Sequence, residues 1–208
     1  MFIAECRFCR EGKDFSVAKE RLGEEWPYEN DVVYHDDNIY AIIGASPQVV
    51  PYILVLPYRH IFSMAEMSAG ELSSARACME YLCGRGGFGE ELCIFEHGGR
   101  SDIGSSSIDH CHIHVIDGKY GLYEDPKFDG FEKRRRVEEV TDYADKRHYL
   151  LVGKFSKEKD EMKVAPGFIA SETQYFRRRL AEILGEKEWD WRKDYRMGKM
   201  IETMKGFL

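Results

Sequence analysis

Apolar and polar positions alternate most regularly in residues 109–116, whose sequence is Asp-His-Cys-His-Ile-His-Val-Ile. A period of two predicts a β-strand with one buried face, formed here by the cysteine, the isoleucine and the valine. The imidazoles of His110, His112 and His114 then line the other face at intervals of roughly 6.5–7 Å. A single histidine in a strand is usually structural. Three in register favour a chemical role, because imidazole serves as nucleophile, metal ligand and proton donor near pH 7.

Short apolar runs before this segment predict the other strands of a sheet. The first two runs flank His35-Asp-Asp-Asn38, a polar sequence typical of a hairpin turn, and the third run ends at Pro57. The four predicted strands cover residues 32–34, 39–43, 52–56 and 92–95. With the histidine segment they make five.

A helix is predicted between the third and the fourth of these strands. Ser68 and Glu71 have the spacing of a capping box, and Gly84 is a residue that typically ends a helix. Apolar residues recur at helical spacing between them, at Leu72, Ala75, Met79 and Leu82. The order strand, strand, strand, helix, strand, strand predicts an α+β fold, in which a long helix packs on an antiparallel sheet of about five strands.

The chain beyond Asp117 is rich in charged and aromatic residues. Apolar runs at residues 149–155 and 162–164, separated by a charged turn, predict a β-hairpin. The basic run in residues 132–136 is expected to be a solvated face rather than a phosphate-binding patch, because two glutamates follow it directly.

Two helices are predicted after this hairpin. Residues 171–174 have a second capping-box sequence, and Gly185 marks the end of the helix that follows. Apolar residues at helical spacing predict a final helix within residues 197–204. We therefore expect one domain over residues 1–125 and a C-terminal extension over residues 126–208, formed by a β-hairpin and helices that pack on the domain.

Composition and charge narrow the class of protein. The chain has 208 residues, with 30 basic and 37 acidic side chains and a net charge of −7, which argues against a nonspecific nucleic-acid binder. No apolar run approaches the ~20 residues of a membrane span, and the N-terminal sequence does not resemble a signal peptide. Six cysteines without an export signal suggest reduced thiols. We expect a soluble cytoplasmic protein that binds neither nucleic acid nor membranes.

Cys6 and Cys9 form a Cys-x-x-Cys pair, which fits a redox pair, half of a zinc site, or two ordinary cysteines. The N-terminus lacks the strand-then-helix context of a redox motif. No second such pair exists, so a structural zinc needs two histidines to complete a Cys₂His₂ tetrahedron. The best candidates are His60 and His110, with His35 and His97 as reserves. Spacing alone leaves the metal-bound and the metal-free alternatives open.

The histidine segment resembles the motif His-φ-His-φ-His-φ-φ of the histidine triad (HIT) family, where φ is an apolar residue. The similarity continues upstream, where Ser46-Pro-Gln48 and Leu54-Val-Leu-Pro-Tyr-Arg-His60 resemble a loop and a strand of that family. In total it covers about residues 5–118, a little over half of the chain. This resemblance implies a HIT-like fold.

The resemblance also implies a nucleotide-binding enzyme. His112 would be the nucleophile that attacks a phosphate and forms a nucleotidyl-histidine intermediate, which water then cleaves. His114 would hydrogen-bond a phosphate oxygen or assist the leaving group. Zinc-containing members of the family use a Cys-x-x-Cys pair, a histidine after the third strand and the first histidine of the triad. In this sequence the implied ligands of a structural Zn²⁺ are Cys6, Cys9, His60 and His110.

The loop before the triad is expected to hold the phosphate through backbone N–H groups and hydroxyls. The expected substrate-binding residues are Gly104, Ser105, Ser106, Ser107, Glu96, His97 and Arg100. Two features depart from the family pattern. The usual ribose-binding acid falls at Gly44, and Glu96 stands near the place of a frequent asparagine. A carboxylate there repels a polyphosphate unless it is protonated or paired, for example with Arg100 or His97.

We therefore expect a zinc-containing HIT hydrolase that cleaves a nucleoside phosphoramidate or a dinucleoside polyphosphate. A nucleotidyltransferase or phosphorylase would use the same chemistry with a different acceptor, and product analysis with and without phosphate separates it from a hydrolase. The alternative from another class is a non-catalytic nucleotide-binding interaction module, which would bind ligand without turnover. Because related proteins often dimerise, a homodimer is a further expectation.

Overall fold

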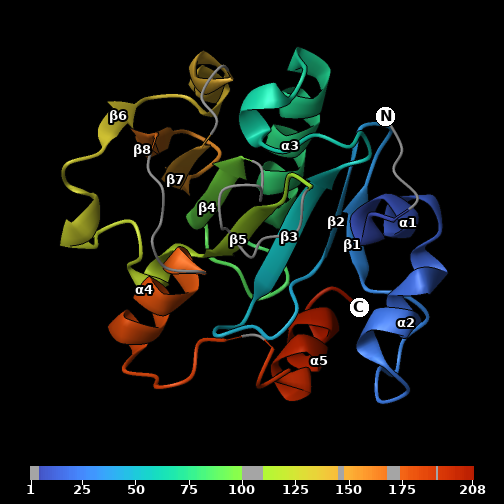
Figure 1. The fold of residues 1–208 in the computed structure, drawn as a ribbon. Helices are drawn as coiled ribbons and strands as arrows, with labels where there is room; N and C mark the ends of the chain where they lie inside the picture. The colour runs from blue at the N-terminus through green and yellow to red at the C-terminus, as the bar shows by residue number, and fades with distance from the viewer. Residues whose placement is uncertain (1–4, 100–109, 145–147, 168–173, 191) are drawn as a thin grey trace.

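The computed structural model describes residues 5–99, 110–144, 148–167, 174–190 and 192–208. Its strands form one eight-stranded sheet in the order β1-β2-β3-β5-β4-β7-β8-β6, and all neighbouring strands are antiparallel (Figure 1). The strands are β1 (Val32–His35), β2 (Ile39–Ile43), β3 (Tyr52–Pro57), β4 (Leu92–Gly99), β5 (Ile113–Asp117), β6 (Glu132–Arg134), β7 (His148–Phe155) and β8 (Asp160–Pro166).

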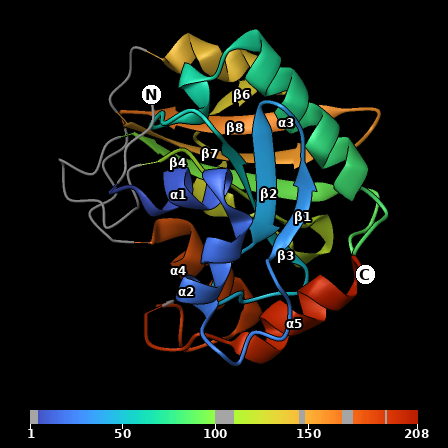
Figure 2. The same ribbon diagram turned by 90° about the vertical axis from the view of Figure 1, so that its right-hand side faces the viewer.

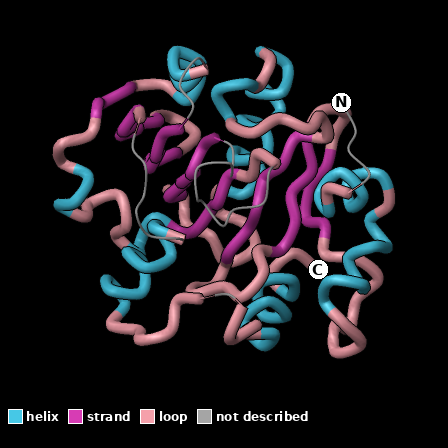
Figure 3. Tube along the Cα trace, viewed as in Figure 1, coloured by secondary structure: helices cyan, strands magenta, loops and turns pink. Residues whose placement is uncertain are grey.

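The five expected strands are present, but the sheet is larger than the expected five because the C-terminal hairpin joins it. β4 pairs with β5 on one side and with β7 on the other, over its whole length from Leu92 to Gly99. β8 and the short β6 continue the same ladder, which Figure 3 shows as one row of strands. The apolar run at residues 149–155 predicts a strand, but no local pattern indicates that its partner is β4.

The helices and 3-10 helices lie on both faces of this sheet. The α-helices are α1 (Arg7–Lys13), α2 (Ala18–Leu22), α3 (Ala69–Leu82), α4 (Tyr175–Leu184) and α5 (Met197–Lys205). The 3-10 helices are η1 (Phe15–Val17), η2 (Met64–Glu66), η4 (Gly118–Tyr120), η5 (Pro126–Phe128) and η6 (Val137–Tyr143). The predicted capping box of α3 is confirmed, because the Ser68 side chain accepts from the N–H of Glu71 and the Glu71 carboxylate accepts from the N–H of Ser68.

The start of α4 lies next to a part of the chain that is not described. Of its predicted capping box, Ser171 falls outside the described residues, and Gln174 precedes the helix with φ of 57° and no side-chain cap. The predicted C-terminal signal is confirmed, since Gly185 caps α4 with φ of 68°, a conformation that glycine adopts without strain.

Two apolar cores cover the two faces of the sheet. The first contains buried residues of α3 and α5, and the second contains Phe8 of α1 and Phe176 of α4. Figure 2 shows α3 on one side of the sheet and α1 and α4 on the other. Along β5, Ile113 and Val115 point into the first core and Ile116 into the second. The predicted alternation is therefore confirmed, and it places the side chains of the triad on the face that α1 and α4 cover.

Candidate active site and metal centre

The triad lies at the start of β5 in the middle of the sheet. β5 begins at Ile113, so His110 and His112 belong to the extended chain just before it rather than to the strand itself. His112 and His114 are half-buried, with their ring centres 5.0 Å apart. Phe8 of α1 packs against His112 at 5.6 Å. The sequence prediction of neighbouring imidazoles is therefore confirmed for these two residues.

One hydrogen bond determines which nitrogen of His112 carries the proton. Nδ1 lies 2.7 Å from the backbone oxygen of His110. Because a carbonyl oxygen only accepts, Nδ1 of His112 must donate, and the lone pair of the neutral ring is then on Nε2. Burial is the largest effect on the pKa of His112 and lowers it, which keeps the ring neutral at neutral pH. A neutral imidazole with a bare Nε2 is the form that a nucleophilic histidine requires.

His114 is held by two aromatic residues. Its ring stacks on Phe95 of β4 at 4.7 Å with an angle of 5°, and its Nδ1 lies 2.9 Å from the hydroxyl of Tyr52 on β3. Strand register accounts for both neighbours: Phe95 pairs directly with His114, and Tyr52 pairs with Ile116, two residues along β5 on the same face of the sheet. Burial lowers the pKa of His114 well below its usual value, and the charges of His112 and Arg177 lower it further.

Two further histidines extend this group across the sheet. The register that pairs Phe95 with His114, continued by two residues, brings His97 toward His112. β7 contributes His148, whose ring centre lies 6.3 Å from that of His97. Burial lowers the pKa of His97 to about 4, with His148 and His112 adding to the effect. No sequence motif marks His148, and only the pairing of Gly99 with His148 between β4 and β7 brings it here.

Glu96 lies on the opposite face of β4 from these histidines. Its carboxylate accepts from the backbone N–H of Met64 at 2.7 Å, from the thiol of Cys111 at 3.3 Å and from the hydroxyl of Tyr149. Burial raises the pKa of Glu96 to about 7. The structure thus places this expected substrate-binding residue in the first core, among protein partners, and not beside His112.

Gly44, the other departure from the family pattern, is explained by Tyr52. A Cβ atom added at Gly44 would lie 2.2 Å from the ring of Tyr52, which is far closer than any van der Waals contact. The two residues are also joined by a 3.0 Å backbone hydrogen bond from the N–H of Gly44 to the oxygen of Tyr52. The missing acid at position 44 is therefore coupled to the tyrosine that bonds His114. The remaining expected phosphate-binding residues lie outside the described part of the chain: Arg100, Gly104, Ser105, Ser106 and Ser107.

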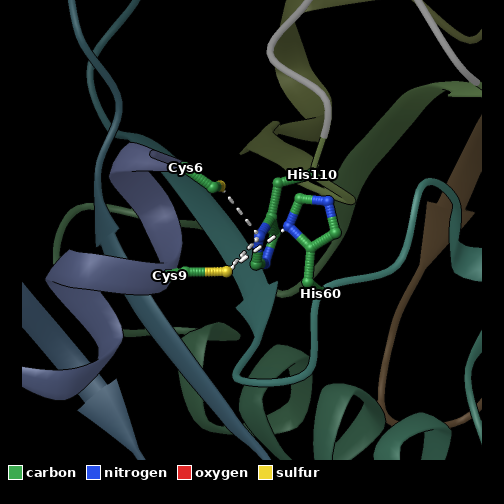
Figure 4. A group of neighbouring side chains, drawn as sticks. All are labelled: Cys6, Cys9, His60 and His110. Carbon is green, nitrogen blue, oxygen red and sulfur yellow. Dashed lines mark hydrogen bonds between the residues drawn. The ribbon is translucent and has the colours of Figure 1, made fainter. Parts of the chain in front are cut away.

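The four expected metal ligands come together next to the triad. The ligand atoms of Cys6, Cys9, His60 and His110 all lie within 4.8 Å of one another. Figure 4 shows the sulfur atoms of both cysteines pointing toward the two imidazoles. Cys9, His60 and His110 are buried, and Cys6 is half-buried at the N-terminal end of α1.

The distances within this group suit a tetrahedral ion. Nδ1 of His110 lies 3.5 Å from the sulfur of Cys6 and 3.6 Å from that of Cys9, and Nδ1 of His60 lies 3.4 Å from the sulfur of Cys9. Tetrahedral zinc with ordinary Zn–S and Zn–N bonds separates sulfur from nitrogen by about 3.6 Å. Nε2 of His110 donates to the oxygen of Pro57 at 2.9 Å, which leaves the lone pair on Nδ1, facing the cysteines. The group could therefore hold a metal ion.

The geometry of sheet and triad agrees with a sequence comparison. Residues 27–121 match the family model described as the HIT domain. This segment of the chain is therefore similar to a HIT domain, and the α+β fold is HIT-like. A search of curated proteins finds no match for the sequence.

Solved structures with a similar chain path include two proteins from clostridia. One is a HIT family hydrolase from Clostridium thermocellum, with 19% sequence identity and a TM-score of 0.36. The other is a histidine triad protein from Clostridium difficile, with 23% sequence identity and a TM-score of 0.38. Each match covers 56% of this chain and 92% of the other. A third is yeast Ap4A phosphorylase Apa2 in complex with AMP, at 16% identity and a TM-score of 0.43, covering 67% of this chain and 61% of the other. Scores this low do not bear on activity.

The described helices also bear on membrane insertion. Among them, none combines the length and the apolar character that crossing a membrane requires.

Proposed function

We propose that this protein is a nucleotide phosphate hydrolase that acts through a nucleotidyl-histidine intermediate on His112. The observation that carries the proposal is the hydrogen bond from Nδ1 of His112 to the backbone oxygen of His110, because it leaves the lone pair on Nε2. The match of residues 27–121 to the HIT domain supports the same assignment, since the resemblance implies attack on a phosphate by the middle histidine of the triad.

The reaction has two displacement steps at phosphorus. In the first, the lone pair on Nε2 of His112 forms a bond to the α-phosphorus, and the bond from phosphorus to the leaving group breaks with its electron pair on that group. In the second, a water oxygen bonds to phosphorus, the P–N bond breaks, and its electron pair returns to Nε2, while the water proton passes to solvent. In this proposal His114 donates a hydrogen bond to a phosphate oxygen in both steps, which is supported by its half-buried ring lying 5.0 Å from that of His112.

We further propose that the metal in the Cys6, Cys9, His60 and His110 group is structural zinc. Two thiolates and two imidazoles match the preference of zinc, and all four protein ligands leave no open position for a substrate. The bound ion would fix α1 to the sheet. Phe8 of α1 packs on both His110 and His112, so this attachment also holds the wall of the active site.

The test is chromatographic analysis of products from adenylated amines and dinucleoside polyphosphates, with and without inorganic phosphate. We compare the unmodified chain with His112→Ala and with His35→Ala, a matched control on β1 that packs on Phe15 away from the triad. We expect turnover in the first and third proteins and none in the second. Equal turnover in a folded His112→Ala protein would contradict the proposal. A product that carries added phosphate would identify a phosphorylase. Nucleotide binding without turnover would identify an interaction module.

A further inference from the structure

Tyr52 is the one described side chain that hydrogen-bonds a ring nitrogen of His114. Its hydroxyl lies 2.9 Å from Nδ1, and both rings are held in place, Tyr52 by full burial and His114 by the stack on Phe95. A tyrosine hydroxyl and an imidazole nitrogen can each donate or accept, so this distance alone does not give the direction of the bond. The direction matters, because it determines which nitrogen of His114 carries the proton on the side of the substrate.

Arg177 of α4 favours one direction of this bond. This buried arginine donates to the backbone oxygen of Trp189 at 3.2 Å and to that of Ser46, and these bonds fix its guanidinium 5.8 Å from the centre of the Tyr52 ring. The charge of this guanidinium lowers the pKa of the Tyr52 hydroxyl, against the larger, opposite effect of burial. A nearby cation makes a phenol O–H a stronger hydrogen-bond donor and its oxygen a weaker acceptor, so Tyr52 beside Arg177 is favoured as the donor.

The tyrosine proton is then directed to the histidine. Because an imidazole nitrogen is also a much better acceptor than a phenol oxygen, Tyr52 donates its own proton to Nδ1 of His114. Because the ring is neutral, its remaining proton must be on Nε2, the nitrogen on the far side of the ring from Tyr52. An Nε2–H group can donate to a phosphate oxygen, whereas a bare Nε2 would repel it.

Gly44 supplies the space that this arrangement needs. Any side chain at position 44 would overlap the Tyr52 ring, at 2.2 Å from its nearest atom. The Gly44 turn, Tyr52 and Arg177 are thus one unit, in which Ser46, two residues after Gly44, accepts from the same guanidinium.

We infer that Tyr52 and Arg177 are positioning residues that hold His114 as its Nε2–H tautomer, so that the segment after the HIT domain sets the protonation of a triad histidine. The inference concerns the free protein. Its catalytic consequence rests on the proposed function, in which His114 donates to the phosphate.

The first test reads the tautomer directly. In the ¹⁵N spectrum of the full chain with its bound metal, the protonated and the bare ring nitrogens of a histidine are well separated. We expect the proton of His114 on Nε2 in the unmodified protein, and a smaller share of this tautomer in Tyr52→Phe. The matched control is Tyr120→Phe, which loses a hydroxyl bonded to the oxygen of Val50 and should leave His114 unchanged. A proton on Nδ1 of His114 in the unmodified protein would overturn the inference, whatever its activity.

The second test separates positioning from folding. Arg177→Lys keeps a buried cation and donor, whereas Arg177→Gln loses the charge, so the lysine variant should retain more of the Nε2–H tautomer than the glutamine variant. For turnover, Tyr52→Phe should lower kcat about tenfold with little change in KM, the usual size of a lost hydrogen bond to a reacting group. Equal tautomer shares in the two arginine variants, both folded by circular dichroism, would remove Arg177 from the assignment. A changed tautomer without turnover in any variant would contradict the proposed function alone.

Discussion

The two faces of the β4–β5 strand pair carry similar polar residues but use them in opposite ways. On the face toward α3, both oxygens of Glu96 are bonded by the protein itself, through Met64, Cys111 and Tyr149. On the face toward α1 and α4, His112 and His114 each have one nitrogen bonded through Nδ1. Within the described ranges, no hydrogen bond is found for Nε2 of either ring.

The difference teaches how a structural polar group is distinguished from a chemical one in this protein. A buried group whose hydrogen-bonding capacity is used up by the protein stabilises the fold and has nothing left for a ligand. A group that the protein hydrogen-bonds through one atom, and that has no such partner at another atom, is oriented for a substrate. Residue type does not decide the matter, since a tyrosine stands at the centre of each arrangement, Tyr149 on one face and Tyr52 on the other.

The largest effect is expected where the histidine face meets the metal. Cys9→Ser removes the sulfur that lies within 3.6 Å of two imidazole nitrogens. We expect bound zinc to fall from about one ion per chain to near zero, with a loss of several kcal/mol in the free energy of unfolding. Mass spectrometry of the native protein and thermal unfolding measure both. Cys83→Ala, at a buried cysteine outside the group, should keep the metal. Full zinc occupancy in folded Cys9→Ser would contradict the ligand set.

The opposite face is expected to make stability depend on pH. Glu96 has a pKa raised by burial from 4.5 to about 7, so the protonated carboxyl is favoured in the folded state. Its contribution is complete below pH 4.5 and is lost as the pH rises toward 7, by up to about 3 kcal/mol. Thermal unfolding between pH 4.5 and 7.5 should show this decline in the unmodified protein and a much weaker one in Glu96→Gln. The exposed control Glu124→Gln should behave as the unmodified protein. Parallel curves for all three proteins would show that Glu96 is charged throughout this range.

The two tyrosines give the sharpest contrast between the faces. Tyr149→Phe removes the hydroxyl that accepts from the N–H of Ala65 and donates to the carboxylate of Glu96. The loss of these two hydrogen bonds should lower the free energy of unfolding by about 1–3 kcal/mol. Its turnover per folded molecule should not change. Tyr52→Phe should cost about 1 kcal/mol and lower kcat instead. Chemical denaturation and steady-state kinetics on both variants decide the point. A loss of turnover in Tyr149→Phe larger than that in Tyr52→Phe would mean that the faces are not independent.

Features of this fold that are encoded locally could be predicted from the sequence. Alternation predicted which residues of the triad strand share a face, and a capping box predicted the start of α3. The grouping of the four candidate metal ligands was predicted from Cys-x-x-Cys and from resemblance. It is confirmed by the short distances between their ligand atoms.

Features that depend on pairing between distant strands could not be predicted. The approach of His148 to His97 requires β7 to lie beside β4, and nothing near either residue specifies that partner. Predicting which face of the sheet Glu96 lies on requires the register of β4 against β5, and an apolar run in the sequence does not specify that register. The Tyr52 ring occupies the space that a side chain at position 44 would need, and this contact exists only in the folded chain. The sequence therefore showed the departure from the family pattern at Gly44 but not its cause.

The smallest effect is expected at Cys111, although it stands between two histidines of the triad. Its thiol donates to Glu96 on the far face, and burial together with that carboxylate raises its pKa well above the usual value, so it remains a neutral thiol. Cys111→Ser keeps a donor at this position and should change stability by no more than about 1 kcal/mol, with zinc content and turnover unchanged. Metal analysis and kinetics beside His112→Ala provide the comparison. A loss of turnover in Cys111→Ser as large as that expected in His112→Ala would contradict the conclusion that these neighbouring residues act on separate faces of the sheet.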